Sequence, residues 1–275
     1  MKSLKIKVCG MRDAENIAEL IELPIDYIGF IFYEKSPRYV ALMPQLINSN
    51  KFKKINKVGV FVNADIDFVL NKITQFDLNT IQLHGEETPQ YLIDLRNKIN
   101  EFTSNKLNPM VNSELLIADK LELSSNELQL NNNELQLNNN QLELSGYQLE
   151  VQINDSKLIN SELKISIWKA FSIDEQFNFD NTKPYESIAD ALLFDTKTPQ
   201  HGGSGQKFNW DLLQNYQGKT PFFLSGGISA SDTEGVKSVT HPEFSGLDLN
   251  SKFEISPAFK DVELLKKFID TIHIF

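Results

Sequence analysis

Residues able to move protons stand at the ends of short apolar runs in this sequence. Cys9 ends the run KIKVC, His84 ends TIQLH, and Asp195 lies one residue before the end of ALLFDT. A cysteine whose thiolate is stabilised by nearby donors or charge can act as a base, and a carboxylate beside apolar walls can act as a general acid. Each also has a structural interpretation, because a lone cysteine is commonly a buried hydrophobe and an aspartate at a strand end commonly caps a loop. His84 can simply support a turn at Gly85.

Glycine-rich turns and one arginine indicate contacts to an anion. Ser225-Gly226-Gly227 and Asn250-Ser251 each follow an apolar run, and Gly202-Gly203-Ser204-Gly205 lies in a polar loop after ALLFDT. Because glycine has no Cβ, the backbone can approach a phosphate closely, and the N–H groups at the start of a following helix favour negative charge. Paired glycines also make ordinary tight turns. Arg38 can either bind a carboxylate through two hydrogen bonds or lie on the surface.

The elements that must position these residues alternate between strand and helix. Short apolar runs predict strands at residues 5–9, 27–32, 56–62, 80–84, 165–171, 191–196, 221–225 and 246–250. Helical spacing predicts helices at 14–22 with Asp13 as N-cap, after Pro44, at 65–76, from about 88, near 173–179 or 185–191, from 210, at 231–239 and at 260–272. This alternation predicts an α/β fold of the TIM type, a closed (β/α)8 barrel that residues 1–275 form as a single domain.

In such a barrel the loops that follow the strands share one rim, and active sites lie at that rim. The residues named above all fall in those loops or at those strand ends, although they are far apart in the sequence. Gly226-Gly227 and Asn250-Ser251 would then occupy the usual phosphate position, after strands seven and eight. Cys9 and Asp195 would face the same space, where they could serve as an acid–base pair.

The alternation stops at residues 100–164, which are rich in Asn, Leu, Glu, Gln and Ser and lie between the fourth predicted helix and the fifth strand. A seven-residue repeat occupies 126–132, 133–139 and 140–146. A heptad period hints at a coiled coil, but leucines at positions i and i+2 have the spacing of a strand. Two interpretations stay open: a disordered low-complexity insertion, and a small β flap of short strands joined by Asn turns.

Composition limits the classes of partner. The chain has 275 residues, a formal net charge of −10 and a single cysteine, so neither an internal disulfide nor a cysteine-rich zinc site is expected. We find no basic stripe typical of nucleic-acid binding, no apolar run long enough to cross a membrane and no signal peptide, so a cytoplasmic location is expected. The expected partner is a small phosphorylated molecule, with no nucleic acid and no membrane, and the chain is expected to be a monomer or weak dimer.

Taken together, the motifs resemble the phosphoribosylanthranilate isomerase family. The resemblance covers residues 5–99 and 165–272. It rests on Lys7-Val8-Cys9-Gly10-Met11, Gly29-Phe30-Ile31-Phe32, Ser36-Pro37-Arg38, Val58-Gly59-Val60-Phe61-Val62, Gln82-Leu83-His84-Gly85-Glu86, Phe194-Asp195, Gly202-Gly203-Ser204-Gly205, Phe208-Asn209-Trp210, Ser225-Gly226-Gly227, Asp248-Leu249-Asn250-Ser251, Glu254, Pro257 and Lys260-Asp261. The combination of KVCG, SPR, QLHG and GGSG in this order is highly specific for that family.

The resemblance implies an Amadori rearrangement of N-(5-phosphoribosyl)anthranilate in tryptophan biosynthesis. Asp195 would protonate the furanose ring oxygen and Cys9 would remove the C2′ proton, a scheme that requires no metal and no cofactor. Arg38 would contact the anthranilate carboxylate. The remaining substrate-binding residues implied are His84, Gly203, Gly226, Gly227, Asn250 and Ser251, the last three at the phosphate.

Two segments depart from the family pattern. The chain has Ser251-Lys252-Phe253-Glu254 where the family often has Ser-Gly-Val-Glu, and Pro257-Ala258 where it often has Pro-Gly. These changes lie near the expected phosphate site and leave open which backbone amides bind it. Lys252 is a candidate for an additional phosphate contact.

Other functions compete with the isomerase. A pentose-phosphate epimerase would need metal-ligating His and Asp residues at strand ends, where His84 is the only histidine. An indole-glycerol-phosphate synthase would need several lysines there, but only Lys169 lies within a predicted strand and Lys197 just after one. A non-catalytic scaffold whose insertion binds a partner would keep its biological function without Cys9.

The insertion is predicted to leave the barrel opposite the rim, because it joins a helix to the strand that follows. A surface insertion costs little beyond loop-closure entropy, which grows only logarithmically with length. Replacing residues 100–163 by a short linker should therefore leave isomerase turnover unchanged, as followed by the fluorescence of the substrate. A folded deletion variant without activity would contradict this expectation.

Overall fold

The computed structural model describes residues 4–42, 52, 54–107, 136–138, 141–144, 147–149, 164–197 and 207–273. The chain divides into two compact units, one made of Met1–Asn97 with Lys164–Phe275 and the other of Lys98–Leu163. The predicted insertion coincides closely with the second unit. Each unit is described by itself.

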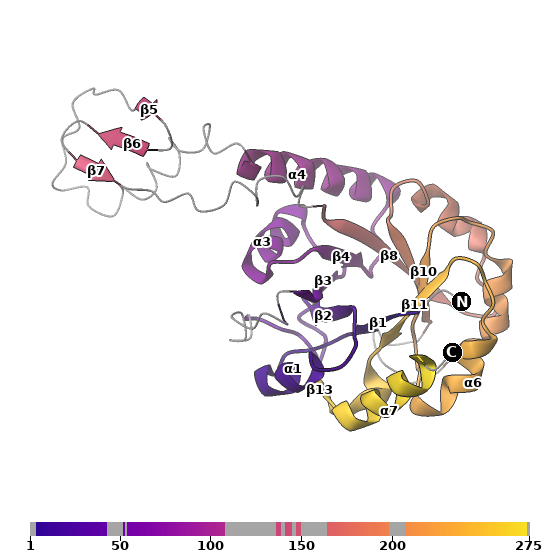
Figure 1. The fold of residues 1–275 in the computed structure, drawn as a ribbon. Coiled ribbons are helices and arrows are strands. Elements are labelled where there is room, and N and C mark those ends of the chain that lie inside the picture. The colour runs from indigo at the N-terminus through magenta and orange to yellow at the C-terminus, as the bar shows by residue number, and fades with distance from the viewer. Residues whose placement is uncertain are drawn as a thin grey trace. The chain divides into compact units, whose positions relative to one another are not determined.

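Eight parallel strands of the first unit close into a barrel (Figure 1). In barrel order they are β1 (Lys5–Val8), β2 (Tyr27–Ile31), β3 (Asn56–Phe61), β4 (Thr80–Leu83), β8 (Ser166–Ile173), β9 (Ala191–Thr196), β10 (Phe222–Leu224) and β11 (Phe244–Leu249), and β11 pairs with β1. These strands are mostly buried on both faces, which is why they read as continuous apolar runs. The closed barrel confirms the predicted (β/α)8 fold.

Helices surround the strands (Figure 1). They are α1 (Ala14–Leu20), α3 (Ile66–Phe76), α4 (Pro89–Leu107), α6 (Thr233–Ser238) and α7 (Val262–His273), with 3-10 helices η2 (Phe179–Tyr185), η3 (Trp210–Asn215), η4 (Ala230–Asp232) and η5 (Ser251–Phe253). Asp13 caps α1 as predicted, by accepting a hydrogen bond from the backbone N–H of Asn16 at 2.8 Å. Of the helix expected after Pro44, only Phe52 and Lys54 are described, and both are helical.

Short 3-10 helices stand where α-helices were expected after β8 and β9. Pro184 lies inside η2 and cannot donate a backbone hydrogen bond, so a continuous α-helix cannot form through it. η3 spans six residues, and its N-cap Asn209 accepts a hydrogen bond from the backbone N–H of Asp211. Both differences fall outside the sheet and leave the strand ends, and therefore the rim, in the predicted arrangement.

Aromatic side chains fill the interior of the barrel. Trp168 stacks on Phe223 with ring centroids 4.4 Å apart, and Tyr27 meets both rings edge-on. These residues come from β8, β10 and β2, so the cluster connects opposite walls. Tyr27 also packs against the cluster that contains Cys9 and Val60. The barrel is thus a packed core that supports the strand ends rather than an open channel.

A β-hairpin that the sequence pattern did not predict follows β11. It consists of β12 (Glu254–Ser256) and β13 (Phe259–Lys260), with Glu254 opposite Lys260. The last helix therefore begins after Asp261 and not at Lys260, because Asp261 accepts a hydrogen bond from the backbone N–H of Leu264 at 2.9 Å and so acts as its cap. The hairpin carries Glu254 and Lys260, which contact each other and lie next to Arg38.

The second unit contains three short strands among its described residues. β5 (Gln136–Asn138), β6 (Gln141–Leu144) and β7 (Tyr147–Leu149) form an antiparallel sheet with Leu137 opposite Leu142. Residues 100–107 of the predicted insertion continue α4. Apart from these residues, the three strands and residue 164, the remainder lies outside the described residues, so the disordered and flap interpretations both stay predictions.

Ala258 in the turn of the hairpin has φ of +68° and is buried, a conformation that suits glycine better. Ala258→Gly should raise the free energy of unfolding by up to about 1 kcal/mol, because a left-handed residue with a Cβ costs about 1–2 kcal/mol, offset partly by the greater freedom of glycine in the unfolded chain.

Urea denaturation measures this change. Ala230→Gly is the matched control, because Ala230 is exposed in η4 and is not among the positive-φ residues. It should lower stability by about 0.5–1 kcal/mol. Equal losses in the two variants would show that the turn at Ala258 carries no backbone strain.

Candidate active site

A pocket opens at the carboxyl ends of the barrel strands. It encloses about 1000 Å³ of empty space including its mouth. All but one of the predicted site residues line it, namely Cys9, Arg38, His84, Asp195, Gly226, Gly227, Asn250 and Ser251. The exception is Gly203, which lies outside the described residues. The prediction that these residues meet at the carboxyl ends of the strands is therefore confirmed for the described ones, although they are spread over most of the chain.

Cys9 follows β1 directly and forms part of the pocket wall. Its backbone N–H donates to the carbonyl of Leu249 at 2.9 Å, which ties it to the end of the last barrel strand. Its side chain packs against Gly29, where an added Cβ would lie only 2.8 Å from Sγ. Burial raises the pKa of the Cys9 thiol, while the nearby charge of Lys7 lowers it. The thiol is therefore protonated at neutral pH unless more positive charge arrives.

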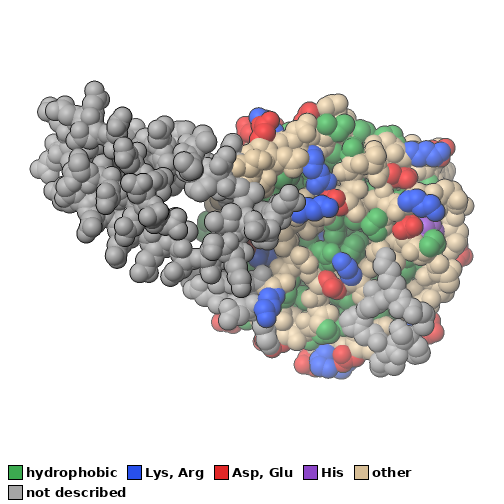
Figure 2. Space-filling model, turned by 45° about the horizontal axis from the view of Figure 1, so that its top comes forward, with side chains coloured by type: hydrophobic (Ala, Val, Ile, Leu, Met, Phe, Trp, Pro, Cys, Tyr) green, Lys and Arg blue, Asp and Glu red, His purple; other side chains and the backbone are tan. Residues whose placement is uncertain are grey.

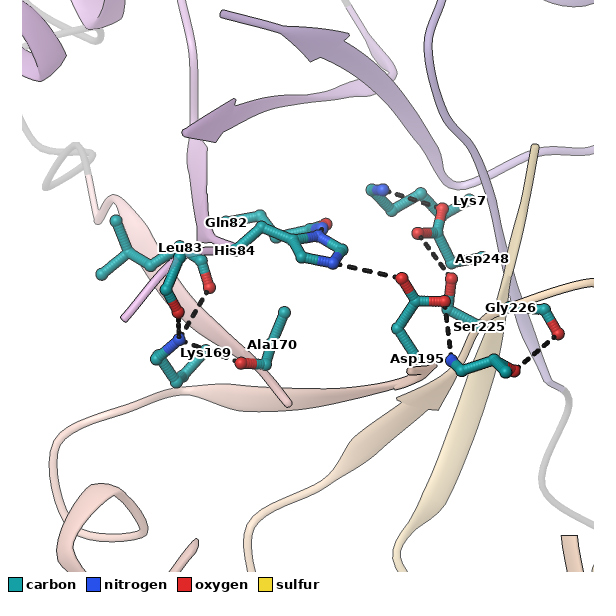
Figure 3. Close-up of polar contacts among 12 residues, drawn as sticks. Lys7, Gln82, Leu83, His84, Lys169, Ala170, Asp195, Ser225, Gly226 and Asp248 are labelled. Atoms are coloured by element: carbon teal, nitrogen blue, oxygen red, sulfur yellow. Dashed lines mark hydrogen bonds and ion pairs between the residues drawn. The ribbon is translucent and has the colours of Figure 1, made fainter. Parts of the chain in front are cut away.

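Lys7 supplies that nearby charge from two residues earlier on the same face of β1. It is fully buried, and its Nζ lies 2.8 Å from Oδ1 of Asp248 (Figure 3). Asp248 Oδ2 accepts a hydrogen bond from Ser225 Oγ at 3.3 Å. Burial opposes the charge of Lys7, but Asp248 and Cys9 outweigh it and raise its pKa, so the lysine stays protonated. The sequence pattern alone did not indicate a role for Lys7, although strand alternation places it on the same face as Cys9.

Asp195 points into the pocket from β9 and is held at both oxygens. Oδ1 accepts from the backbone N–H of Thr196 at 2.9 Å, and Oδ2 lies 3.1 Å from Nε2 of His84 (Figure 3). The amide nitrogen of Gln82 is 3.0 Å from Nδ1 of His84. With Gln82 donating to Nδ1, the ring proton sits on Nε2 and is donated to Asp195. His84 thus positions the carboxylate, and Gln82 was not anticipated from the sequence.

Lys169 holds the loop that carries His84. It is buried, its Nζ donates to the carbonyl of Gly85 at 2.8 Å, and it pairs with Glu87 at 3.3 Å. Glu87 in turn accepts from the backbone N–H of Gly85 at 3.0 Å. Burial lowers the pKa of Lys169 and Glu87 counteracts this. Lys169 does not line the pocket.

Lys197, the other lysine considered for a synthase, also has a partner. It is exposed and pairs with Asp174 at 2.6 Å. Both strand-associated lysines are therefore committed to structural contacts. Among the described residues no group of three or more His, Cys, Asp or Glu side chains is arranged to hold a metal ion, which an epimerase site would need.

Two glycine positions shape the part of the rim after β10. Gly226 and Gly227 have φ of +88° and +67°, and a Cβ at Gly226 would lie 2.4 Å from the backbone nitrogen of Thr196. Only glycine fits there without displacing β9. Asn250 and Ser251 approach from the neighbouring strand end at the start of η5. Lys252 is exposed and is not among the residues that line the pocket, and its phosphate contact stays a prediction.

The visible surface of the barrel carries mixed charge (Figure 2). Figure 2 shows acidic and basic side chains scattered in small groups over the visible part of the barrel, without a basic stripe. None of the described helices is long and apolar enough to span a bilayer. The cationic groups near the pocket are instead a few buried side chains, chiefly Lys7 and Arg38.

Comparisons with known proteins agree with this geometry. The profile of the family described as N-(5'phosphoribosyl)anthranilate (PRA) isomerase matches residues 6–123 and 131–271. Proteins named N-(5'-phosphoribosyl)anthranilate isomerase from Parabacteroides distasonis and Phocaeicola vulgatus are 35% and 31% identical, each over 97% of this chain and over 92% and 97% of their own lengths.

Solved structures agree at the level of the fold. The phosphoribosyl anthranilate isomerase from Thermotoga maritima superposes with a TM-score of 0.64 at 24% identity, covering 99% of this chain and 100% of that one. The enzyme of the same name from Thermus thermophilus gives a TM-score of 0.64 at 19% identity, with 98% of each chain covered. With a family profile spanning the barrel and relatives that match along nearly the whole chain, this protein belongs to the N-(5'-phosphoribosyl)anthranilate isomerase family.

Proposed function

We propose that the pocket converts N-(5-phosphoribosyl)anthranilate to 1-(2-carboxyphenylamino)-1-deoxyribulose 5-phosphate, with Asp195 as acid and Cys9 as base. The main support for this proposal is that one pocket is lined by a thiol, a carboxylate, an arginine and a paired-glycine turn. In the same order, these groups match the C2′ proton, the ring oxygen, the carboxylate and the phosphate of that molecule. A related barrel at 22% identity was crystallised with reduced 1-(o-carboxyphenylamino)-1-deoxyribulose 5-phosphate, which suits a phosphorylated small molecule as the partner here.

Asp195 begins the reaction by donating a proton to the furanose ring oxygen. The bond between that oxygen and C1′ breaks, and the nitrogen lone pair forms a C1′=N double bond, which leaves a cationic iminium. The hydrogen bonds from Thr196 and His84 hold the carboxyl group in one orientation for this step. Proton transfer from a positioned acid contributes about 10²- to 10⁴-fold to a rate.

Cys9 then removes the C2′ proton in its thiolate form, which is the minor form at neutral pH because burial raises the pKa of the thiol. The electrons of the C2′–H bond neutralise the iminium and give an enolamine, which tautomerises to the ketone. The iminium brings positive charge next to the thiol at this stage, which favours the thiolate and offsets the effect of burial. Lys7 favours the thiolate in the same way from below, and Asp248 and Ser225 keep Lys7 in place.

Asp195 and Cys9 must both return to their starting protonation states after each turnover. Asp195 has lost a proton and Cys9 has gained one, while the enolamine-to-ketone step is proton-neutral. The side chains of Asp195 and His84 are 21% and 27% exposed, so water reaches this side of the pocket. Cys9 is only 3% exposed, so its proton leaves after the product has gone and the pocket has refilled with water.

The phosphate is assigned to the turns at Gly226-Gly227 and Asn250-Ser251. The start of the next helix is already occupied, because Asp232 accepts from the backbone N–H of Ser229 at 2.7 Å. A carboxylate there would repel a phosphate, which favours the glycine turn and η5 as the site. Arg38 also lines the pocket and would bind the anthranilate carboxylate.

Removing either proton-transfer group tests the assignment. Cys9→Ala and Asp195→Asn should each lower kcat about 10²-fold or more, with KM changed far less, because the lost interaction is with the transition state. The loss of phosphoribosylanthranilate fluorescence measures turnover. Asp190→Asn is the control, because Asp190 immediately precedes the same strand and pairs with Arg96 at 2.6 Å away from the pocket. Its turnover per folded molecule should stay normal, and near-normal turnover in both test variants would rule out the assignment.

The ionisation of Cys9 gives a second test, since it is the only cysteine in the chain. Alkylation by iodoacetamide, followed by mass spectrometry, should be slow at neutral pH and rise with pH to a midpoint above the ordinary thiol range, because burial raises the pKa of Cys9. The value of kcat/KM should rise over the same interval. Lys7→Met should move the midpoint to still higher pH, because the charge that lowers this pKa is gone.

Two further variants make that comparison decisive. Lys57→Met removes another buried lysine, which lies on β3 and pairs with Asp77 at the end of α3, and should leave the alkylation midpoint unchanged. Lys7→Met together with Asp248→Asn avoids a buried unpaired carboxylate and should give a smaller upward shift than Lys7→Met alone. A midpoint that does not move in either Lys7 variant would show that Lys7 has no influence on the thiol.

A further inference from the structure

Arg38 is fixed by a buried carboxylate from the far end of the sequence. Its Nε lies 2.8 Å from Oε1 and 3.1 Å from Oε2 of Glu254, and its Nη2 lies 2.6 Å from Oε2. Both side chains are nearly inaccessible to solvent. This fork-to-fork contact fixes the plane of the guanidinium as well as its position. Nη1 makes no hydrogen bond to any residue in the described part of the chain, and Arg38 lines the pocket.

Lys260 binds the same carboxylate from the other strand of the hairpin. Its Nζ lies 2.6 Å from Oε1 of Glu254 and 2.9 Å from Oδ1 of Asn250, and its side chain is buried. The backbone N–H of Ala258 also donates to Oε1 at 3.1 Å. Arg38 and Lys260 together hold the pKa of Glu254 below its usual range despite burial, so the carboxylate is charged.

The hairpin itself is anchored to the first helix. The side-chain amide of Asn16 donates to the carbonyl of Lys260 at 2.9 Å and accepts from its N–H at 2.7 Å. Gly10 gives Arg38 and Asn250 room to meet above β1, because a Cβ there would lie 2.6 Å from Cδ of Arg38 and 3.0 Å from Oδ1 of Asn250. These contacts leave little freedom for the cluster to rearrange.

The charge count of this cluster bears on what Arg38 can bind. Arg38 paired with Glu254 alone would be neutral overall and a weak site for an anion. Lys260 restores a net charge of +1 to the three side chains, and of the three only Arg38 lines the pocket. Burial strengthens each of these interactions because water cannot screen them.

We propose that Glu254 and Lys260 are positioning residues for the aryl-carboxylate subsite: Glu254 orients the guanidinium of Arg38, and Lys260 cancels the charge of Glu254 so that Arg38 can attract a carboxylate. The proposal rests on the function proposed above. It assigns neither residue a contact with the reacting atoms, and it predicts an effect only on substrates that carry the carboxylate.

Kinetics with two substrates test the inference. One is N-(5-phosphoribosyl)anthranilate and the other is N-(5-phosphoribosyl)aniline, which lacks the carboxylate. Glu254→Gln and Lys260→Met should each raise KM for the first about ten- to hundredfold with a smaller change in kcat, as expected for a charged hydrogen bond that is misplaced or weakened. For the aniline substrate both variants should resemble the wild type.

The double variant separates orientation from charge. Glu254→Gln with Lys260→Met returns the cluster to +1 through Arg38 alone, so its KM for the anthranilate substrate should fall below that of Lys260→Met. Lys266→Met on α7 is the control for loss of a lysine, because Lys266 pairs with Asp270 on the exposed helix surface at 2.7 Å. Thermal melting and circular dichroism establish that each variant is folded.

The outcomes distinguish this inference from the function on which it depends. A wild type that turns over neither substrate would overturn both. A wild type that is active, with Arg38→Met impaired only on the carboxylate substrate while Glu254→Gln and Lys260→Met are not, would leave the function standing and overturn the inference. Equal losses on the two substrates in folded Glu254 and Lys260 variants would show a general structural role and overturn it as well.

Discussion

A buried ion pair between Lys7 and Asp248 underlies both the closure of the barrel and the chemistry of its pocket. The two residues are register partners on β1 and β11, the strands whose pairing closes the sheet, and their charged atoms are 2.8 Å apart with almost no solvent access. Removing one partner of such a pair leaves an uncompensated buried charge, which typically costs 3–5 kcal/mol. The fold is therefore more stable when that positive charge is in place, next to the thiol.

Long-range contacts also hold the segments that follow β2 and β11. Glu254 joins Arg38 to the hairpin, and the hairpin joins the first helix through Asn16. Glycine sets the close approaches: at Gly10 and Gly226 a Cβ would collide with side chains or backbone from other strands. The pocket is thus shaped by contacts between loops, while the buried cluster around Trp168 packs the interior of the barrel.

Much of this could be predicted from the sequence, for physical reasons. Parallel strands buried on both faces leave continuous apolar runs, and the rim rule needs only the residue at the end of each run. Lys7, Gln82 and the hairpin were missed. A lysine inside a barrel becomes intelligible only with Asp248, which is 241 residues away, and β12–β13 depends on Asn16 and Arg38 rather than on local propensity. The 3-10 helices likewise reflect Pro184 and short connections rather than periodicity.

The long sequence separations across the rim have a consequence for how the protein comes into being. Lys7 meets Asp248, Asn16 meets Lys260 and Arg38 meets Glu254 across 241, 244 and 216 residues. Contacts of such high contact order form late in folding, after the loop-closure entropy between them has been overcome. During synthesis β1, which carries Lys7 and precedes Cys9, has no partner on its β11 side until β11 has left the ribosome. A growing or truncated chain has the residues of the acid and the base but not the electrostatic surroundings in which they work.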